Sequence, residues 1–361
     1  MRIAQIAPLY ESVPPRHYGG TERVVSYLTE ELVKQGHQVT LFASGDSVTQ
    51  AALVAPCERS LRTLPGCIDP LAHYAILMDE VLSRSAEFDI LHFHIDHMHF
   101  PFTKNVGLPT VTTLHGRLDI PDLQPLYRHF SQMPIVSISR AQRIPIPAAN
   151  WVGNVYHGLL RDLHSLQTRP DKDAYAAFLG RISPEKRPDR AIRIASKAGI
   201  RLRIAAKIDA VDRAYFNSEI KPLLDLPGIE FLGEINESQK TEFLGNATAF
   251  LFPIDWPEPF GVAVIEAMSC GTPVIAFRCG SVPEIIDEGV SGFIVNSEEQ
   301  AVDAIEKCRN IDRRICRAAF ERRFTADRMA KDYIEIYRKL ADEEALPLVA
   351  MPSRTGSSLA S

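Results

Sequence analysis

The chain has 361 residues, of which 45% are apolar and 24% charged, and its formal net charge is −5. At roughly 150 residues per domain, this length predicts two domains, each large enough to bury its own core. The composition is ordinary for a globular protein, and the slight acidic excess argues against a nucleic-acid-binding surface, which normally carries a clear excess of Lys and Arg.

The cysteines and the first residues are typical of a cytoplasmic protein. Six cysteines are few for this length and show no C-x-x-C spacing, so we expect reduced thiols rather than disulfide bonds or a zinc site. The start, M-R-I-A-Q-I-A-P, turns polar too soon for a signal peptide, and no run of about 18 apolar residues could span a bilayer. We therefore expect a cytoplasmic location, with peripheral membrane contact left open.

Short β-branched runs alternate with helical patterns in the first half of the chain, as a parallel sheet with crossover helices requires. A helix is expected over residues 21–35, where Val24, Leu28 and Leu32 recur at helical spacing and Gly36 can end it. Together these elements predict one doubly wound domain over residues 1–165. Its expected strands cover residues 2–7, 38–43, 90–94, 110–114 and 135–138.

The loop between the first expected strand and this helix reads H-Y-G-G-T-E-R and contains Gly19 and Gly20. Glycines permit a positive φ and a backbone close to a ligand, and Thr21 can cap the helix. A tight turn would also need glycine, so the pair alone is weak evidence of a site, and Glu22 is expected to be structural. No G-x-G-x-x-G follows the strand, which counts against a nicotinamide enzyme.

Histidines gather at the ends of two expected strands. His92 and His94 alternate along one strand and therefore share a face, so a metal site there is conceivable, although we expect none. His115 stands at the end of the strand over residues 110–114 and is expected to point into a cleft. A hydrogen-bonded strand-end histidine without a further role is the alternative.

A polar stretch without periodicity, residues 161–173, is expected to lead into a second domain over residues 174–325. Ligands of such paired Rossmann-like halves bind at the carboxyl ends of the strands. The pattern at residues 326–343 predicts an amphipathic helix, and residues 344–361, rich in Pro and Ser, are expected to be a disordered tail. The expected strands of the second domain cover residues 175–179, 201–206, 229–232, 247–252, 274–277 and 292–295, with helices such as 188–197 and 237–244 between them.

The most informative segment reads D-W-P-E-P-F-G-V-A-V-I-E-A-M-S-C-G-T-P-V. A strand leads into a loop with Glu258, a helix follows, and Glu266 lies about one turn inside it. The loop carboxylate can accept hydrogen bonds from hydroxyls, and the amides of Phe260, Gly261 and Val262 at the positive helix end can hold an anion. Two solvated glutamates are the alternative, but a carboxylate in the apolar run V-A-V-I-E-A-M needs a dedicated partner. Hydroxyl and phosphate contacts together suggest a nucleotide sugar.

A second segment, A-F-L-G-R-I-S-P-E-K-R-P, places Arg181 and Lys186 between an expected strand and the next helix. Two cations and a helix N-terminus at the cleft edge suit a pyrophosphate, whose charge they would neutralise as it leaves. A solvated basic loop is the alternative, and Arg187 is expected to lie on the surface.

These segments resemble the motifs of retaining glycosyltransferases of family 4. Pro-Glu-Pro-Phe-Gly, Glu-Ala-Met and Cys-Gly-Thr-Pro-Val occur together and in the family's order, and the Gly-Arg and Glu-Lys pairs match a second motif. The resemblance covers about residues 1–340. It implies the GT-B architecture, in which two Rossmann-like, doubly wound parallel-sheet domains face each other across a cleft, and it implies that the helix at residues 326–343 crosses back to the first domain.

The resemblance assigns catalytic roles to four residues. It implies that Arg181 and Lys186 contact the donor diphosphate and that His115 approaches the donor sugar. Glu258, with the amides that follow it, would orient the sugar hydroxyls.

It also implies a set of donor-binding contacts. Gly19 and Gly20 would face the donor phosphates and the reacting centre, and Glu266 would accept hydrogen bonds from both ribose hydroxyls. The backbone of Ile235 is the expected contact for the base, and the amides of residues 260–262 complete the set. His157 stands where the family more often has Asn, so no role is assigned to it.

The expected activity is retaining transfer of a hexose from a nucleotide-diphosphate sugar to an acceptor hydroxyl. UDP-glucose is the default donor, with GDP-mannose and UDP-N-acetylglucosamine as alternatives, and the acceptor stays open among a saccharide, a lipid-linked sugar and a small molecule. No cofactor and no obligatory metal are expected, because two cations and a helix end can stabilise the leaving group. A nucleotide-sugar 2-epimerase or hydrolase and a catalytically dead nucleotide-sugar-binding protein are the competing classes.

Overall fold

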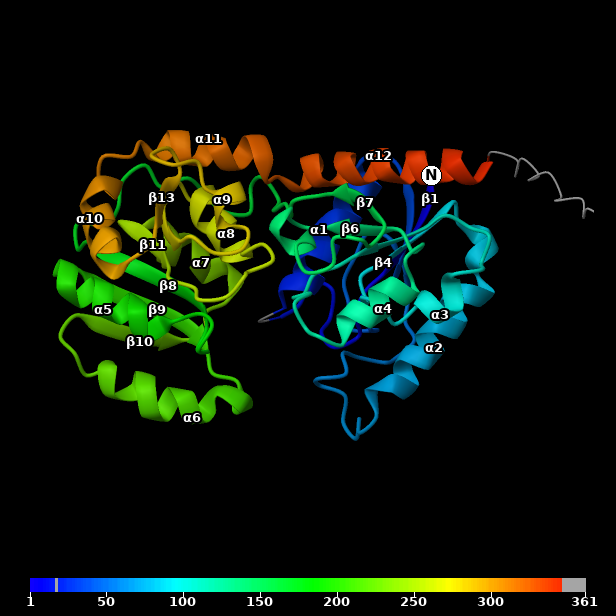
Figure 1. Cartoon of the computed structure of the whole chain (residues 1–361), viewed down its shortest axis with the longest axis horizontal. Helices are drawn as coiled ribbons and strands as arrows, with labels where there is room; N and C mark the ends of the chain where they lie inside the picture. Colours follow the sequence, from blue (N-terminus) through cyan, green and yellow to red (C-terminus); the bar gives the residue numbers. More distant parts are fainter. Residues whose placement is uncertain (17–18, 346–361) are drawn as a thin grey trace, which may run out of the picture.

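The computed structural model describes residues 1–16 and 19–345, which form two α/β units, each built on one parallel sheet (Figure 1). The N-terminal unit has a seven-stranded sheet with the order β3-β2-β1-β4-β5-β6-β7. Its strands are β1 (Arg2–Ile6), β2 (Gln38–Phe42), β3 (Ala52–Val54), β4 (Ile90–Phe93), β5 (Thr110–Thr113), β6 (Ile135–Ser137) and β7 (Trp151–Asn154).

The C-terminal unit has a six-stranded sheet with the order β10-β9-β8-β11-β12-β13. In both sheets the strand order reverses once, between β1 and β4 and between β8 and β11, which is the doubly wound arrangement. The expected pair of Rossmann-like parallel-sheet domains is confirmed. The strands of the C-terminal unit are β8 (Tyr175–Arg181), β9 (Arg201–Lys207), β10 (Ile229–Gly233), β11 (Ala249–Phe252), β12 (Val274–Phe277) and β13 (Gly292–Val295).

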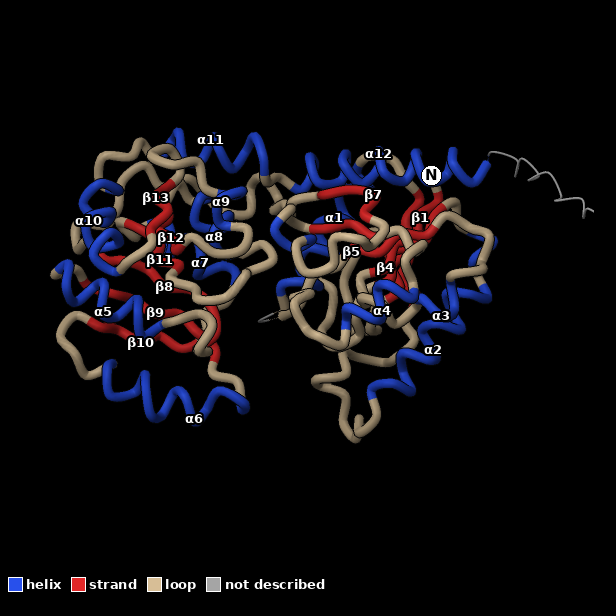
Figure 2. Tube along the Cα trace, in the orientation of Figure 1, coloured by secondary structure: helices blue, strands red, loops and turns tan. Residues whose placement is uncertain are grey.

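Helices surround the strands of each unit (Figure 2). Central strands such as β4 and β11 are buried along their whole length, as expected for a parallel sheet with helices on both faces. The helices of the N-terminal unit are α1 (Gly20–Lys34), α2 (Pro70–Ser83), α3 (Phe100–Thr103) and α4 (Leu123–His129). Those that follow are α5 (Pro188–Ala198), α6 (Arg213–Tyr215), α7 (Glu237–Gly245), α8 (Val262–Ser269), α9 (Val282–Ile285), α10 (Glu298–Cys308), α11 (Arg313–Arg323) and α12 (Ala326–Ala345).

Every expected strand is present, with ends that differ by at most two residues, but two strands were missed. β3 has only three residues and β7 contains a glycine, and each lies at an edge of the first sheet. β3 is an apolar run of only three residues, and Gly and Asn interrupt the apolar pattern of β7, so neither shows the longer run or clear alternation by which strands are recognised in a sequence.

The two units are connected by two chain segments that cross side by side. The backbone amide of Leu159 donates to the Phe324 carbonyl at 2.9 Å, and that of Ala326 donates to the Leu159 carbonyl at 2.8 Å. A Cβ atom on Gly158 would lie 2.3 Å from the carbonyl oxygen of Thr325, so only glycine fits this close approach. The residues expected as a linker are also held in place: the Arg317 guanidinium donates to the carbonyls of residues 161 and 164.

Beyond this crossing, α12 runs along the N-terminal unit and packs against α1 (Figure 1). Its inward face buries Met329, Tyr333 and Tyr337. The helix continues to Ala345, so the first two residues of the expected tail are helical, and residues 346–361 lie outside the described part of the chain. No helix among the described residues combines the length and apolar character needed to cross a membrane.

Candidate active site

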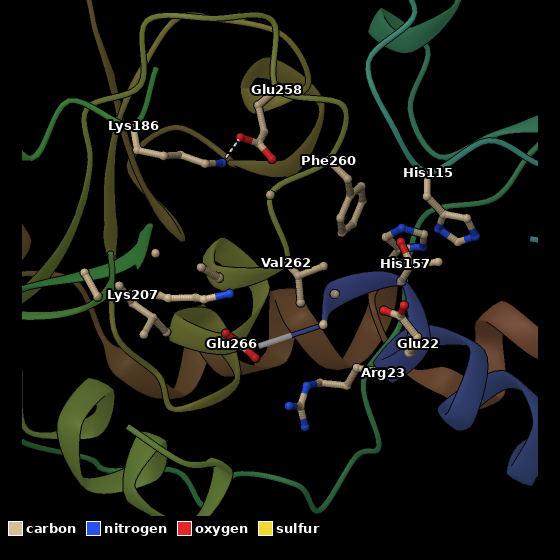
Figure 3. Close-up of a pocket in the computed structure, with 18 of the residues that line it drawn as sticks. Glu22, Arg23, His115, His157, Lys186, Lys207, Glu258, Phe260, Val262 and Glu266 are labelled. Atoms are coloured by element: carbon tan, nitrogen blue, oxygen red, sulfur yellow. Dashed lines mark hydrogen bonds and ion pairs between the residues drawn. The ribbon is translucent and has the colours of Figure 1, made fainter. Parts of the chain in front are cut away.

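A cavity of about 430 Å³ lies between the two units, against the carboxyl ends of both sheets (Figure 3). The N-terminal unit contributes the loop after β1, the start of α1 and the residues after β5 and β7. The C-terminal unit contributes the ends of β8 and β9, the loop after β11 and the start of α8. The predicted site residues that line it are Gly19, Gly20, His115, Lys186, Ile235, Glu258, Phe260, Gly261, Val262 and Glu266.

Arg181 is the one predicted site residue that does not line this cavity, although its neighbour Gly180 does. Its guanidinium lies 3.7 Å from Asp209 and 3.9 Å from Asp212, both in the segment after β9. Lys207, the last residue of β9, lines the cavity, with its Nζ 2.8 Å from Asp209. Lys207 was not predicted as a site residue, although its place at the carboxyl end of a strand was a usable signal. The diphosphate contact expected of Arg181 stays a prediction.

Lys186 and Glu258 form an ion pair in the C-terminal wall of the cavity (Figure 3). Lys186 lies on the connection from β8 to α5, and Glu258 on the loop from β11 to α8. Their side chains are only 14% and 12% exposed. The Lys186 ammonium also lies 5.1 Å from the ring centre of Trp256 and 5.6 Å from that of Phe252, within the range of cation–π attraction. A cation and a carboxylate are thereby held side by side where a ligand can contact both.

The loop that carries Glu258 is fixed by the turn after β12. The Ser281 amide donates to the Glu258 carbonyl at 3.0 Å, and the Ser281 hydroxyl donates to the Phe260 carbonyl at 2.8 Å. Gly280 has a φ of +53°, and a Cβ atom there would lie 2.4 Å from the Glu258 carbonyl oxygen. The position of the loop therefore depends on backbone packing as well as on the ion pair.

The first turn of α8 adds backbone donors beside this pair. Gly261 is the N-cap residue with a φ of +85°, and the helix has neither a side-chain cap nor an acidic residue in its first turn. The first amides of a helix have no acceptor within the helix, and the helix dipole makes this end positive. The turn from Phe260 to Val262 is therefore suited to an anionic oxygen.

Glu266 has the dedicated partner that its apolar surroundings required. Its side chain is buried, and one oxygen lies 2.7 Å from the Lys240 ammonium. Burial alone would raise the pKa of this carboxyl, but Lys240, His164 and Arg23 outweigh it and hold the pKa below its usual value. Lys240 also pairs with Glu237 at 3.2 Å, which in turn pairs with Arg23 of α1 at 2.6 Å. Glu266 is therefore an ionised acceptor at the end of a charge network that joins the two units.

Three side chains of this charge network lie close enough together to be considered as ligands of one metal ion. The ligand atoms of His164, Glu237 and Glu266 lie within 4.8 Å of one another. The two carboxylates, however, are already neutralised by Lys240 and Arg23, whose positive charges oppose a second cation in the same place. The donor set therefore does not fit a metal.

His115 follows β5 and lies in the N-terminal wall of the cavity, opposite Glu258 (Figure 3). Burial lowers the pKa of His115 to about 3, so its ring is neutral. The ring is stacked on His157, with centres 5.2 Å apart and planes at 18°, and His157 in turn contacts the Phe260 ring edge-on at 5.0 Å. His157 was assigned no role from the sequence because the family more often has Asn at this position, and the structure places it in the cavity wall.

His92 and His94 share one face of β4, as expected, with ring centres 4.0 Å apart. The two ring nitrogens of His92 lie 2.6 Å from the Tyr337 hydroxyl and 2.7 Å from the Thr113 hydroxyl. Those of His94 lie 2.9 Å from His115 and 2.8 Å from the Gln5 side-chain oxygen. All four nitrogens already have partners in the protein, which leaves neither ring available to a metal.

Gly19 and Gly20 line the cavity, as expected, but neither residue needs to be glycine because of a positive φ. Gly19 has a φ of 167°, which is extended backbone, so the positive φ that glycine permits is not used there, and α1 begins without a side-chain cap from Thr21. Gly19 is required because a Cβ atom would lie 2.7 Å from the ring of Pro15, whereas nothing lies within 4 Å of the Cβ position on Gly20. Glu22, expected to be structural, also lines the cavity, and burial raises its pKa.

A second cavity, of about 500 Å³, adjoins the first and shares part of its lining. The shared residues are Glu11, Arg62, Lys207 and Glu234. The rest of the lining comes from loops of the N-terminal unit, residues 12–16, 45–46 and 58–63, and consists mainly of charged and hydroxyl side chains. A polar molecule in this space would reach the main cavity from the side of the N-terminal unit.

Two family profiles match consecutive parts of the chain. Glycosyltransferase Family 4 matches residues 18–172, and Glycosyl transferases group 1 matches residues 162–321. Between them they span residues 18–321, which include every residue predicted for the site.

Curated relatives include the D-inositol 3-phosphate glycosyltransferase of Mycolicibacterium smegmatis, which is 33% identical over 135 residues, 36% of this chain and 31% of the relative. The protein of the same name from Mycobacterium tuberculosis H37Ra is 32% identical over 144 residues, 38% of this chain and 30% of the relative. The alignments thus span about a third of the length of these relatives.

Solved structures resemble the whole fold. A sucrose-phosphate synthase from Thermosynechococcus elongatus has a TM-score of 0.77 at 16% identity, covering 95% of this chain and 99% of that one. AviGT4, a glycosyltransferase involved in avilamycin A biosynthesis, has a TM-score of 0.71 at 21% identity, covering 94% and 98%. Anabaena HepE in complex with UDP and glucose has a TM-score of 0.71 at 16% identity, covering 94% and 100%. At these identities the likeness shows the GT-B fold alone.

Proposed function

The chain belongs to glycosyltransferase family 4, and on that premise we propose that it transfers a hexose from a nucleotide-diphosphate sugar to an acceptor hydroxyl with retention of anomeric configuration. UDP-glucose is the proposed donor. The observation that carries the proposal is the convergence, in one interdomain cavity, of Lys186, Glu258, Glu266 and the first turn of α8 with His115 from the opposite unit.

Each part of the cavity suits one part of such a donor. The Lys186 ammonium, near Lys207 and the positive end of α8, suits the diphosphate, because all three favour negative charge. Glu258 can accept hydrogen bonds from sugar hydroxyls, and the ionised Glu266 can accept both ribose hydroxyls. Ile235 lies in the wall between β10 and α7, where its backbone can contact the base.

In the proposed reaction the bond between the anomeric carbon and the phosphate oxygen breaks, and its electron pair goes to that oxygen. The acceptor oxygen forms the new bond on the same face of the sugar, and its proton passes to the departing phosphate. Lys186 stabilises the negative charge that develops on the leaving group, while Glu258 holds the sugar in place. The side-chain cations and the end of α8 supply positive charge at the diphosphate, so we propose that the step has no obligatory metal.

The second cavity supports a hydroxyl-rich, polar acceptor such as a saccharide or polyol. Its lining consists mainly of charged and hydroxyl-bearing residues, whose polar atoms can form hydrogen bonds with the hydroxyls of such an acceptor. The names of the curated relatives point the same way, since an inositol phosphate is a polar polyol.

The test is an incubation of the protein with a panel of nucleotide sugars, with and without candidate polyol and saccharide acceptors. We expect nucleoside diphosphate release from UDP-glucose to depend on the acceptor, and the anomeric coupling constant of the product to match that of the donor. An inverted product would contradict the retaining mechanism. Release or rearrangement of the donor without any acceptor would identify a hydrolase or an epimerase, and tight donor binding without turnover would identify a binding protein. Lys186→Ala protein is the control for contaminating activity.

A further inference from the structure

His115 is the end of a hydrogen-bonded chain that runs into the N-terminal sheet, and we propose that this chain sets its tautomer. In the proposed tautomer Nε2 of His115 carries the proton and Nδ1 presents a lone pair to a substrate hydroxyl. His94 and Gln5 are then positioning residues, since they act on substrate only through His115. The identity of the substrate rests on the proposed function, whereas the tautomer rests on the contacts in the chain.

The direction of each hydrogen bond in this series follows from which of its atoms can donate. Nε2 of His94 lies 2.8 Å from the side-chain oxygen of Gln5, and an amide oxygen can only accept, so this nitrogen carries the proton. A neutral imidazole has one N–H, which leaves Nδ1 of His94 as an acceptor. That atom lies 2.9 Å from Nε2 of His115, so Nε2 of His115 must donate to it. Nδ1 of His115 is left unprotonated.

Both rings have to be neutral for this assignment, and burial ensures it. Burial lowers the pKa of His94 well below its usual value, and neighbouring histidines add to the effect. The pKa of His115 is lowered to about 3 by the same cause. Burial and the neighbouring histidines, which shift these pKa values, both disfavour a charged ring.

The orientation of the Gln5 amide is supported from its other side. Its amide nitrogen lies 3.0 Å from the Tyr337 hydroxyl on α12 and 3.3 Å from Nδ1 of His92. If Gln5 donates to Tyr337, the Tyr337 hydroxyl can donate to His92 at 2.6 Å, and His92 can donate to Thr113 at 2.7 Å. These contacts are all buried, and the arrangement gives each donor an acceptor.

The outer end of the chain is the part that can receive a ligand. Nδ1 of His115 is buried and has no hydrogen-bond partner within the described residues, and the residue lines the main cavity. The stacked ring of His157 restrains the plane of the imidazole, so the lone pair has a fixed direction. A neutral acceptor pairs with a hydroxyl and is repelled by phosphate oxygens, so this corner of the cavity would select the sugar and exclude the diphosphate.

The tautomer can be read directly by long-range nitrogen–proton NMR on full-length protein labelled with ¹⁵N-histidine, with His115 assigned from the spectrum of His115→Gln. In the wild type we expect the signals of an Nε2-protonated ring. His94→Phe removes the acceptor for that proton, so we expect a mixture of tautomers. His94→Asn, whose side-chain oxygen can replace Nδ1 of His94, is expected to restore the wild-type signals. An Nδ1-protonated or charged His115 in the wild type would overturn the inference, even if both His94 variants failed to fold.

Kinetics then link the tautomer to catalysis. His94→Phe should lower kcat/KM about tenfold, the effect of one lost hydrogen bond, and His94→Asn should recover most of that loss. His99→Phe is the matched control: His99 is another buried histidine, bonded to Thr103 at 2.8 Å and Thr112 at 2.6 Å, outside this chain. It should lower stability and leave the signals of His115 unchanged. An equal loss of kcat/KM in both Phe variants would show that His94 is merely structural.

The two proposals fail in different ways. If no nucleotide sugar is turned over but His115 is Nε2-protonated, the proposed function fails and the tautomer assignment stands. If transfer is observed but His115 is Nδ1-protonated, the function stands and the positioning role of Gln5 and His94 is wrong.

Discussion

The two walls of the cavity are polar by opposite means around Lys186 and around His115. The C-terminal wall uses charged side chains in pairs, Lys186 with Glu258 and Lys240 with Glu266. The N-terminal wall around His115 uses neutral imidazoles, whose pKa values burial has lowered. A charge is retained where an opposite charge lies beside it, and a buried group without such a partner becomes neutral.

This difference divides the work of the proposed reaction. Charged groups on one wall suit the diphosphate and ribose, which carry negative charge or several hydroxyls. Neutral, directional groups on the other wall suit single sugar hydroxyls and add no charge beside the reacting carbon. Changes that affect only one of the two walls test this division.

Lowering the pH should destabilise the N-terminal wall and its unit the most. The buried histidines have folded-state pKa values below the unfolded value of about 6.5, so their contribution to stability is complete above that pH and is lost as the pH falls toward the folded values. At about pH 5.5 each such histidine costs about 1.4 kcal/mol, and together they cost several kcal/mol of unfolding free energy. The histidines concerned are His92, His94, His99, His115 and His157.

Urea unfolding at about pH 8 and about pH 5.5 measures this effect. His99→Phe should show a shallower pH dependence than the wild type, because one of the titrating groups is absent. An equal stability at the two pH values would contradict the neutral character of the N-terminal wall.

Removing the Lys186 ammonium from the C-terminal wall should have the largest effect on catalysis. Lys186→Ala is expected to lower turnover by about 2 to 4 kcal/mol in activation free energy, because the leaving phosphate loses a charged donor. Steady-state kinetics with the donor in excess measures it. Lys197→Ala, a half-exposed lysine paired with Glu298 outside the cavity, should keep full activity. Normal turnover in Lys186→Ala would remove Lys186 from the mechanism.

Replacing the buried carboxylate of Glu266 with an amide should weaken nucleotide binding more than it lowers turnover. Glu266→Gln keeps the shape of the side chain but reduces its strength as an acceptor, so we expect about 2 kcal/mol weaker binding of UDP, or roughly 30-fold. Isothermal titration calorimetry measures the change. Pyrophosphate has no ribose and serves as the control, since its affinity should be unchanged. Equal losses for UDP and pyrophosphate would refute a ribose contact.

The smallest expected effect is that of Glu258→Gln. Turnover should fall about tenfold through a weaker hydrogen bond to the sugar, while the melting temperature stays close to that of the wild type. The loop is also held by Ser281 and by the close packing of Gly280, so its fold does not depend on the carboxylate charge. A collapse in thermal stability would instead assign Glu258 a structural role.

Much of this site was predictable because the relevant signals are local. The alternation of strand and helix patterns predicted both sheets, and the carboxyl ends of the strands predicted where Lys186, Glu258 and His115 would meet. An isolated carboxylate in an apolar helix predicted that Glu266 has a partner, although not that the partner is Lys240.

The features that were not predicted share a physical cause: the neighbours of a residue in space come from other segments of the chain. Arg181 is the last residue of β8 rather than part of the following loop, and Asp209 and Asp212 lie beside its guanidinium. Lys207 on the neighbouring strand lines the cavity and was missed. Glycine is required at position 19 by the close approach of Pro15 and not by a positive φ.

The sequence by itself determined the two-domain parallel fold and the chemical types of the groups in the cleft, because periodicity and turn residues act over a few positions along the chain. The tertiary structure alone decided which groups are charged. It brought Lys240 to Glu266 from another helix and buried His94 between Gln5 and His115. Protonation depends on burial and on nearby charges, and these are fixed only when distant segments pack together.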